Sequence, residues 1–403
     1  MNHPRLALQP VTGLSLASQG ELMVDWPKKS VQARELKLWV GKTPIRLQDL
    51  AIDALSARGP SIRMQLHLDR LRLQDLLDSL PESLIPVVKG SLVEGTLDLH
   101  GSLALDLDKP ERSGLELSGG VTEFKAVFIP PRCDARAIAR PDFKHLARKH
   151  GLLKKTILVG PANPDFIPLD DMGPYLRGAV LTCEDGSFMT HHGFMLRHIN
   201  DSLRRDMRER RFVRGASTIS MQLAKNLFLS EEKTISRKLQ EVMLTWYLEH
   251  EIDKKRLLEV YLNIIEWGPD IYGVGPAARH YFHRHPGKLL PIQAAYLASV
   301  IMNPVRFYYM KARGQVSEGW RINLAFILEK MRQRGTITQE EFDLAAAHDF
   351  EVPFGDAVWA ETPVVSPDQA GKASIVVPPV TNPDQTDMLE LKEDGSGLTK
   401  TPE

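Results

Sequence analysis

The sequence contains 403 residues, more than one average domain, which suggests two or three domains. Hydrophobic residues make up 43% and charged residues 25%, as in ordinary globular chains that form a core. The 51 basic residues balance the 51 acidic ones, so the charge gives no reason to expect a nucleic-acid partner. Only two cysteines occur, Cys133 and Cys183, which excludes a disulfide framework and a multi-cysteine metal site.

Two features bear on targeting. The sequence has no run of about 18 apolar residues, so we expect no helix that spans a bilayer. The start, from Met1 to Arg5, has no charged region followed by an apolar one, so it does not indicate a signal peptide. We therefore expect either a cytosolic protein or a chain that lacks its N-terminal targeting segment.

Residues 1–125 are predicted to form a β-rich domain. Hydrophobic residues alternate with polar ones from Ile62 to Leu68 and from Leu97 to Leu107, the period of strands with one buried face. Between them, the leucines from Leu73 to Leu80 have helical spacing. This half has no cluster of His, Cys or paired carboxylates, which favours a scaffold or binding module over a catalytic domain.

Three further regions follow along the chain. Residues 126–164 are predicted to be a connector, because chain breakers such as Pro130 and Pro131 interrupt them around a basic stretch. Residues 165–350 have mainly helical patterns. Residues 351–403 are predicted to be a disordered tail, since prolines interrupt a polar run in which eight acidic residues from Glu361 onward outnumber three lysines.

The first polar segment of the helical region runs from Glu184 to Gly193. The adjacent carboxylates of Glu184 and Asp185 can supply a general base and a neighbour that orients it, with Phe188 about one helical turn further on. A capped, solvated helix end would show the same pattern.

The second segment runs from Gly215 to Asn226. If a helix begins near Ser217, its apolar residues share one face. Its polar side chains then gather on an arc of about 100° elsewhere on the helix, and these are Thr218, Gln222, Lys225 and Asn226. This stripe can donate hydrogen bonds to a sugar or a phosphate, although an ordinary amphipathic helix fits equally well.

In the third segment, Lys233, Arg237 and Glu241 are spaced i, i+4 and i+8, so we expect all three on one helix face. Two cations suit a diphosphate, because Arg binds it bidentately and Lys supplies a point charge. A plain surface ion pair is the alternative. In the fourth segment, from Lys254 to Asn263, most residues are structural, and Tyr261 and Asn263 are weaker functional candidates.

Two other patterns predict no site. The glycines from Gly273 to Gly275 fit a loose dinucleotide-binding pattern, but no β-branched strand precedes them and no acidic residue follows at the required distance. The three histidines between His280 and His285 lack the spacing of metal ligands, so we expect a surface cluster and no metal site built by the protein.

Taken in order, the four segments resemble the family 51 glycosyltransferases, which include monofunctional transglycosylases and the glycosyltransferase domains of bifunctional penicillin-binding proteins. The patterns E-D-x-x-F-x-x-H-x-G, G-[GA]-S-T-I-[ST]-x-Q-L-x-K-N, R-K-x-x-E and L-E-x-Y-L-N occur in the family order, and a fifth spans Ala295 to Pro304. The resemblance covers about residues 165–345. Gly186 and Met221 depart from it, standing where members often have a basic residue and a glutamine. No transpeptidase motif set follows.

The resemblance implies a lysozyme-like helical fold and a peptidoglycan glycosyltransferase. Its reaction is the inverting transfer that joins lipid II into glycan strands and releases polyprenyl diphosphate. The match assigns the catalytic base to Glu184 and a supporting catalytic role to Glu241, which would orient the cations. It assigns substrate binding to Asp185, Phe188, Ser217, Thr218, Gln222, Lys225, Asn226, Lys233, Arg237 and Asn263. A divalent cation, Mg²⁺ or Mn²⁺, would be held mainly by the substrate diphosphate.

The same resemblance implies a location at the periplasmic face of the inner membrane. Lipid II, the growing glycan strand and the membrane surface would be the partners, together with other cell-wall synthesis proteins. The Arg197–Arg214 segment holds seven arginines against three acidic residues, which suits an anionic lipid surface and equally a solvated, salt-bridged helix.

The N-terminal region resembles the C-terminal portion of AsmA-type β proteins. The helical stretch from Leu73 to Pro81 and the strands as far as Leu107 carry this likeness. Such a domain ordinarily begins further upstream, so we expect it to be truncated at its N terminus. The predicted fold class is therefore α+β and multidomain, with an antiparallel AsmA-like sheet before a mainly helical, lysozyme-like domain.

Two other functions compete with the transferase. A lysozyme-like hydrolase needs a carboxylic acid with a raised pKa, whereas nearby cations lower a carboxyl pKa. The cations in the motifs therefore favour departure of a diphosphate. A non-catalytic envelope protein, an AsmA-like lipid-binding or scaffold protein with a degenerate enzyme domain, would be consistent with Gly186 and Met221. The joint presence of both carboxylates and all three cations argues against it.

Overall fold

A computed structural model describes residue 3 and residues 5–54, 59–149, 151–195, 217–312 and 316–355. Its contacts divide the chain into two compact units. Unit 1 comprises residues 1–169, 184–265 and 272–274, and unit 2 comprises residues 170–183, 266–271 and 275–403. The Arg197–Arg214 segment and nearly all of the predicted tail lie outside the described residues.

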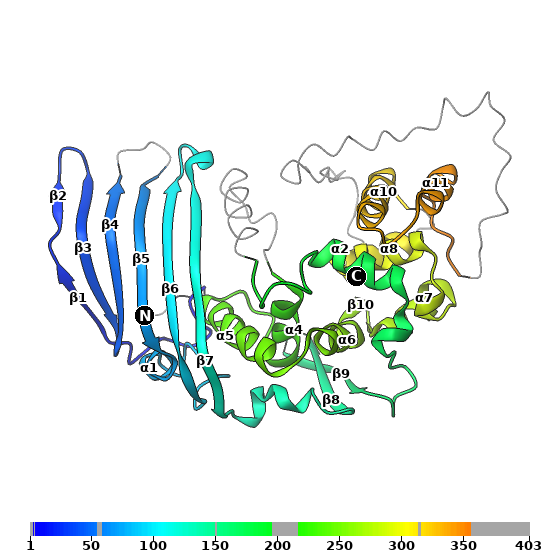
Figure 1. Ribbon diagram of the computed structural model, residues 1–403, viewed down its shortest axis with the longest axis horizontal. Coiled ribbons are helices and arrows are strands. Elements are labelled where there is room, and N and C mark those ends of the chain that lie inside the picture. The colour runs from blue at the N-terminus through cyan, green and yellow to red at the C-terminus, as the bar shows by residue number, and fades with distance from the viewer. Residues whose placement is uncertain are drawn as a thin grey trace, which may run out of the picture. The chain divides into compact units, whose positions relative to one another are not determined.

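The predicted β-rich region forms an antiparallel sheet of seven strands (Figure 1). The strand order is β1-β3-β4-β5-β6-β7, and the short β2 pairs with β3. The strands are β1 (Leu16–Gly20), β2 (Met23–Asp25), β3 (Ser30–Val40), β4 (Thr43–Asp53), β5 (Ser61–Arg72), β6 (Leu92–Asp106) and β7 (Gly114–Phe128). The alternation in the sequence is confirmed, because Ile62 pairs with Ile52 on one side and Leu105 on the other, which puts apolar residues in register across strands.

A small core lies where β5 passes into α1 (Leu73–Ser79). Leu71, Leu73 and Leu97 are buried there, and Trp246 from a distant part of the chain packs against them. The helical spacing of the leucines in this stretch is thus explained by one buried face. The 3₁₀ turn η1 (Pro110–Arg112) joins β6 to β7.

The predicted connector contains regular structure. After the 3₁₀ turns η2 (Pro131–Cys133) and η3 (Ala135–Ala137), the basic stretch forms a hairpin of β8 (Phe143–Lys149) and β9 (Leu152–Val159). Two strands here were not predicted, because lysines and arginines obscure the alternation in which His145 and Ala147 are buried.

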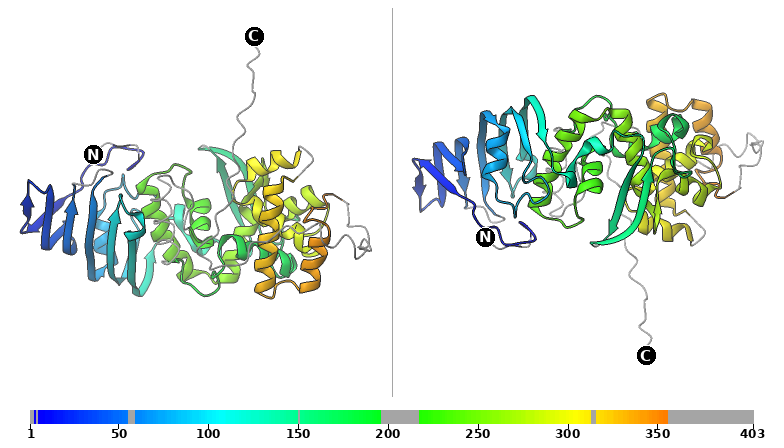
Figure 2. Two further views of the ribbon diagram at one scale, coloured as in Figure 1. Left: turned by 90° about the horizontal axis from the view of Figure 1, so that it is seen from above. Right: turned by 90° about the horizontal axis from the view of Figure 1, so that it is seen from below.

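Three helices complete the described part of unit 1, namely α4 (Ile219–Phe228), α5 (Ile235–Glu251) and α6 (Lys254–Ile264). Each begins with a side-chain cap, since Thr218, Thr234 and Asp253 accept a hydrogen bond from a backbone N–H of the first turn. Figure 2 shows these green helices beside the cyan strands of the same unit. Two contacts fix α5 there, from Ser236 Oγ to the Leu84 carbonyl at 2.8 Å and from the Val87 N–H to Gln240 at 2.7 Å.

Unit 2 is mainly helical and has its own core. Its elements are η4 (Leu169–Met172), α2 (Pro174–Glu184), β10 (Glu266–Gly268), β11 (Ile271–Tyr272), α7 (Val274–Phe282), η5 (Pro286–Lys288), α8 (Pro291–Val300), α9 (Pro304–Ala312), α10 (Glu318–Gln333) and α11 (Gln339–Ala347), with Leu169, Glu184, Tyr272 and Val274 grouped in unit 1. Helix α8 is buried along its whole length, and its Tyr296 stacks on Trp320 with ring centroids 4.8 Å apart. The last family pattern, from Ala295 onward, therefore lies partly in a core helix. Of the helices described, none is long and apolar enough to cross a membrane.

Candidate active site

The two adjacent carboxylates have different surroundings. Asp185 is only 3% exposed. Its carboxylate contacts His191 Nε2 at 2.9 Å and accepts a hydrogen bond from the Ile219 N–H at 3.1 Å. Because Ile219 is the first residue of α4, Asp185 binds the N-terminus of that helix, where a negative charge is stabilised. Asp185 therefore fixes the start of α4, and its neighbour Glu184 is the candidate base.

Glu184 is partly exposed and takes part in a chain of hydrogen bonds. Gln222 Nε2 donates to Glu184 Oε2 at 2.8 Å, and the Tyr261 hydroxyl donates to Gln222 Oε1 at 2.9 Å. Tyr261 is fully buried, and its burial, followed by the charges of Glu184 and Asp185, raises its pKa well above the ordinary value. A neutral phenol thus fixes the orientation of the Gln222 amide, which presents its N–H to Glu184.

The cations surround the second predicted carboxylate. Glu241 is 2% exposed, and its two oxygens accept hydrogen bonds from Arg237 Nη1 and Lys238 Nζ, each at 2.6 Å. Burial lowers the pKa of Lys225, while the charge of Glu241 opposes that shift. Arg237 and Lys238 therefore share one buried carboxylate, and the Lys225 ammonium is near enough to interact with it electrostatically.

One expectation about this cluster is wrong. Helix α5 begins at Ile235 after its cap at Thr234, so Lys233 precedes the helix and does not share a face with Arg237 and Glu241. The second cation is Lys238, which also lies 3.3 Å from Ser217 Oγ. The R-K-x-x-E pattern contains that lysine, so a closer reading of the pattern would have found it.

Asn263 serves the backbone of its own unit. It is 4% exposed, and its amide donates to the Ile167 carbonyl at 2.9 Å and the Glu259 carbonyl at 2.8 Å. Its Oδ1 accepts from the Ile167 N–H at 3.0 Å. Both amide hydrogens are thus used to hold residue 167 against α6, which supports a structural role for Asn263.

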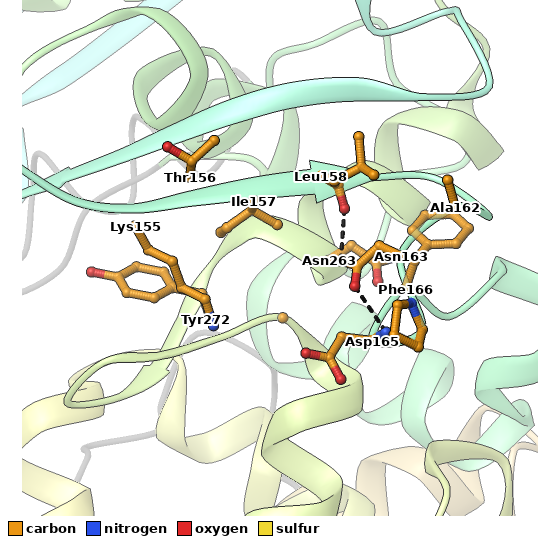
Figure 3. A pocket seen from close by; sticks show the side chains of 12 residues that line it. Lys155, Thr156, Ile157, Leu158, Ala162, Asn163, Asp165, Phe166, Asn263 and Tyr272 are labelled. Carbon is orange, nitrogen blue, oxygen red and sulfur yellow. Dashed lines mark hydrogen bonds between the residues drawn. The ribbon is translucent and has the colours of Figure 1, made fainter.

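A cavity of about 260 Å³ lies beside Asn263 and the β8–β9 hairpin (Figure 3). Asn163 organises one wall, because its amide donates to the Leu158 carbonyl at 2.7 Å and its Oδ1 accepts from the Asp165 N–H at 3.0 Å. The wall is therefore built by local backbone contacts, and neither predicted catalytic carboxylate lines this cavity.

The other predicted residues divide into packing and capping positions. Phe188 is fully buried, and the Lys254 ammonium lies 4.4 Å from its ring centroid. Met221 is 3% exposed, so it belongs to the core and not to the polar stripe. Thr218 caps α4 and donates to the Gly193 carbonyl at 2.7 Å. Asn226 lies half-buried on the same helix.

Helix α4 connects the Glu184 carboxylate with the cations around Glu241. Gln222 contacts Glu184, and Lys225, one turn further along α4, interacts with Glu241. Within the described part of the chain, no group of three His, Cys, Asp or Glu side chains is arranged to hold a metal ion. A carboxylate and a positively charged cluster that both interact with one helix form a candidate site for transferring a group away from an anionic leaving group.

Comparison with known proteins agrees with this class. The family model described as transglycosylase matches residues 151–332. The biosynthetic peptidoglycan transglycosylase of Nitrosomonas eutropha is 48% identical over 143 residues, which are 36% of this chain and 58% of that protein. The corresponding protein of Cupriavidus metallidurans is 40% identical over 171 residues, or 42% of this chain and 73% of that protein. The corresponding protein of Dechloromonas aromatica is 38% identical over 179 residues, which are 44% of this chain and 76% of that protein.

The chain belongs to the transglycosylase family. The match to the Nitrosomonas eutropha protein covers less than two thirds of that relative. The seven-stranded sheet precedes the residues matched by the family model, so its likeness to AsmA-type proteins stays a prediction.

Proposed function

We propose that this protein is a peptidoglycan glycosyltransferase that polymerises lipid II into glycan strands. The proposal depends on one observation above all, the hydrogen-bonded Glu184 joined through α4 to the cation cluster at Glu241. Family membership supports the same reaction, since the relatives compared are named biosynthetic peptidoglycan transglycosylases.

Glu184 acts as the general base. The 4-hydroxyl of the acceptor sugar attacks the anomeric carbon of the donor, the new glycosidic C–O bond forms, and the bond from that carbon to the diphosphate oxygen breaks. The acceptor proton passes to the Glu184 carboxylate. The Gln222 amide donates a hydrogen bond to one oxygen of that carboxylate and so helps to hold it in the orientation that the reaction needs.

The cations act on the leaving group. Polyprenyl diphosphate leaves as an anion, so it requires positive charge and no proton. Arg237, Lys238 and Lys225 supply that charge, and Glu241 keeps the first two in place. Both Glu241 oxygens already accept hydrogen bonds, so a divalent cation would be held mainly by the diphosphate, where it would neutralise further negative charge.

The hydrolase alternative is disfavoured by the environment of Glu184. A hydrolase needs a protonated acid next to an alcohol leaving group. Glu184 accepts a hydrogen bond from the Gln222 amide, which is the role of a carboxylate that acts as a base. A degenerate, non-catalytic domain is disfavoured because both carboxylates and their hydrogen-bond partners are in place.

The substrate determines where the protein acts. Because the polyprenyl tail of lipid II stays in the bilayer, the site works in the periplasmic envelope, at the outer face of the inner membrane. Lipid II and the nascent strand are its partners, and other cell-wall synthesis proteins would join them. We also propose that the N-terminal sheet is AsmA-like and that the helices of the transglycosylase region are arranged as in lysozyme.

The test is glycan-chain synthesis from lipid II by the purified chain. Glu184→Gln is nearly isosteric, so we expect an unchanged melting temperature and a loss of polymerisation by a factor of about 10²–10⁴. The matched control is Glu329→Gln, because Glu329 is a partly buried carboxylate that pairs with Arg332 in unit 2. Near-normal polymerisation by Glu184→Gln would show that the base is assigned wrongly.

A further inference from the structure

Unit 1 contains a second, larger cavity that the proposed reaction does not use. Its volume is about 570 Å³, within the range of about 300–1,000 Å³ for pockets that bind small molecules. Helix α1 and strands β6 and β7 form one wall, and the C-terminal half of α5 forms the other. Its apolar lining includes Leu76, Val93, Val121, Phe124, Met243 and Trp246.

The lining is suited to hydrocarbon. Among the described residues that line the cavity, the basic side chains are those of His192 and His250, so the cavity offers a phosphate neither lysine nor arginine. Its carboxylate, Glu249, already binds the Lys254 ammonium at 2.7 Å and the Ser220 hydroxyl. An apolar ligand can enter without leaving a charge unpaired, whereas a charged headgroup could not.

Aromatic rings and burial make this environment less polar still. The Phe194 and Trp246 rings meet edge to face with centroids 5.6 Å apart, and Phe124 packs on His250 at 4.8 Å. Burial raises the pKa of the Cys133 thiol, which also lines the cavity, to about 11. Aromatic rings bury large areas against hydrocarbon, which suits a long apolar chain.

The cavity adjoins the active site through one short segment. Asp185 holds His191, the Gly193 carbonyl accepts the Thr218 hydroxyl hydrogen bond, and the next residue, Phe194, packs on Trp246 in the cavity wall. The two sites therefore lie at the two ends of residues 185–194.

Helix α5 also connects the two sites. From Glu241 to Trp246 the distance along the helix axis is about 7.5 Å. Met243 lies about 160° round the helix from Glu241, however, on the other side from the cations. A ligand that reaches both sites must therefore be long and flexible enough to pass round the helix.

We infer that this cavity binds part of the isoprenoid chain of the polyprenyl diphosphate lipid, an inference that rests on the proposed function. The lipid has the two parts that the unit separates, an anionic diphosphate for the cations of α4 and α5 and a long hydrocarbon chain for the cavity. Holding part of the chain within unit 1 keeps it out of water and orients the diphosphate during transfer.

The test uses geranylgeranyl monophosphate as the isoprenoid probe and palmitate as the acyl probe, each titrated against the full chain. Val121→Phe places extra carbon atoms in the cavity, and displacing about two methylene groups of the ligand should weaken binding about 15-fold, at about fourfold each. Met243→Gln introduces a polar amide at nearly constant volume. The matched control is Val24→Phe, because Val24 is 48% exposed on β2 and does not line the cavity.

Weaker binding of the isoprenoid probe by Val121→Phe and Met243→Gln, with Val24→Phe unchanged, would support the site. If Val121→Phe fails to fold, Met243→Gln alone decides. Equal binding by all variants would overturn the inference, as would palmitate binding without isoprenoid binding. Polymerisation of a short-chain, water-soluble lipid II analogue should proceed in every variant. If the unmodified chain does not polymerise this analogue, the proposed function is contradicted, whereas the result on isoprenoid binding remains valid.

Discussion

The hydrogen bond between Tyr261 and Gln222 makes a precise prediction, because one oxygen atom can be removed from it. Tyr261→Phe deletes the hydroxyl that donates to Gln222 Oε1 at 2.9 Å. The amide is then free to rotate, and a rotated amide presents its oxygen to the Glu184 carboxylate in place of its N–H. We expect slower polymerisation with an intact fold.

The magnitude follows from the burial of the phenol. A typical internal hydrogen bond contributes about 1 kcal/mol, and a buried acceptor left without a donor costs about 1–3 kcal/mol. Because Tyr261 is fully buried, water does not readily replace the lost hydroxyl. We expect the free energy of unfolding to fall by about 2 kcal/mol and the rate to fall about 5- to 30-fold.

The assay combines polymerisation kinetics with thermal melts. Tyr296→Phe is the matched control, because Tyr296 is also fully buried but its hydroxyl has no hydrogen-bond partner among the residues described. That variant should keep its rate. If Tyr261→Phe behaves like the control, the phenol does not position the base and the proposed chain of hydrogen bonds has no catalytic role.

Three other predictions concern the cations at the start of α5, the hydrogen bonds from Asn263 to the Ile167 backbone, and the β8–β9 hairpin. Arg237→Lys should lower kcat/KM about tenfold in steady-state assays, since an ammonium lacks the planar fork of a guanidinium. Lys233→Ala should lower kcat/KM less than about threefold, because that residue precedes α5. Asn263→Leu should lower the free energy of unfolding by about 2–4 kcal/mol in denaturant titrations, because it leaves the Ile167 backbone groups unpaired. Burial lowers the pKa of His145 to about 4, so the unfolded chain binds the proton at higher pH than the folded chain does. The free energy of unfolding should therefore be unaffected above about pH 6.5 and fall by up to about 3 kcal/mol as the pH drops to 4. His145→Gln should abolish this loss in melts across that range.

Local patterns predicted much of the described structure. Alternating leucines indicated the strands of the sheet, and the polar arc near Ser217 indicated a helix that begins at Ile219. Such features depend on residues a few positions apart, so periodicity reveals them directly. The spacing also placed Gln222 and Lys225 on one side of α4, and in the structure Gln222 contacts Glu184 while Lys225 interacts electrostatically with Glu241.

Contacts between distant residues were not predictable in the same way. Tyr261 was only a weak candidate, because its partner Gln222 lies 39 positions earlier and nothing in the spacing relates the two. Asn263 looked like a substrate ligand for the same reason, since its bonds to residue 167 cross 96 positions. The basic residues of β8 and β9 concealed a hairpin, because only its inward positions are buried.

The N-terminus of α4 determines the geometry on which both halves of the proposed reaction depend. Gln222 holds the base and Lys225 is one of the leaving-group cations, and these two residues lie less than one turn apart along that helix. Asp185 and Thr218 fix where the helix starts, and neither needs to touch the substrate to matter. A displacement of this helix end would move the amide and the ammonium together, and the reaction would lose the base and part of the diphosphate site in one step. Precise placement of one short helix is therefore a stronger requirement on this sequence than any single contact with the substrate.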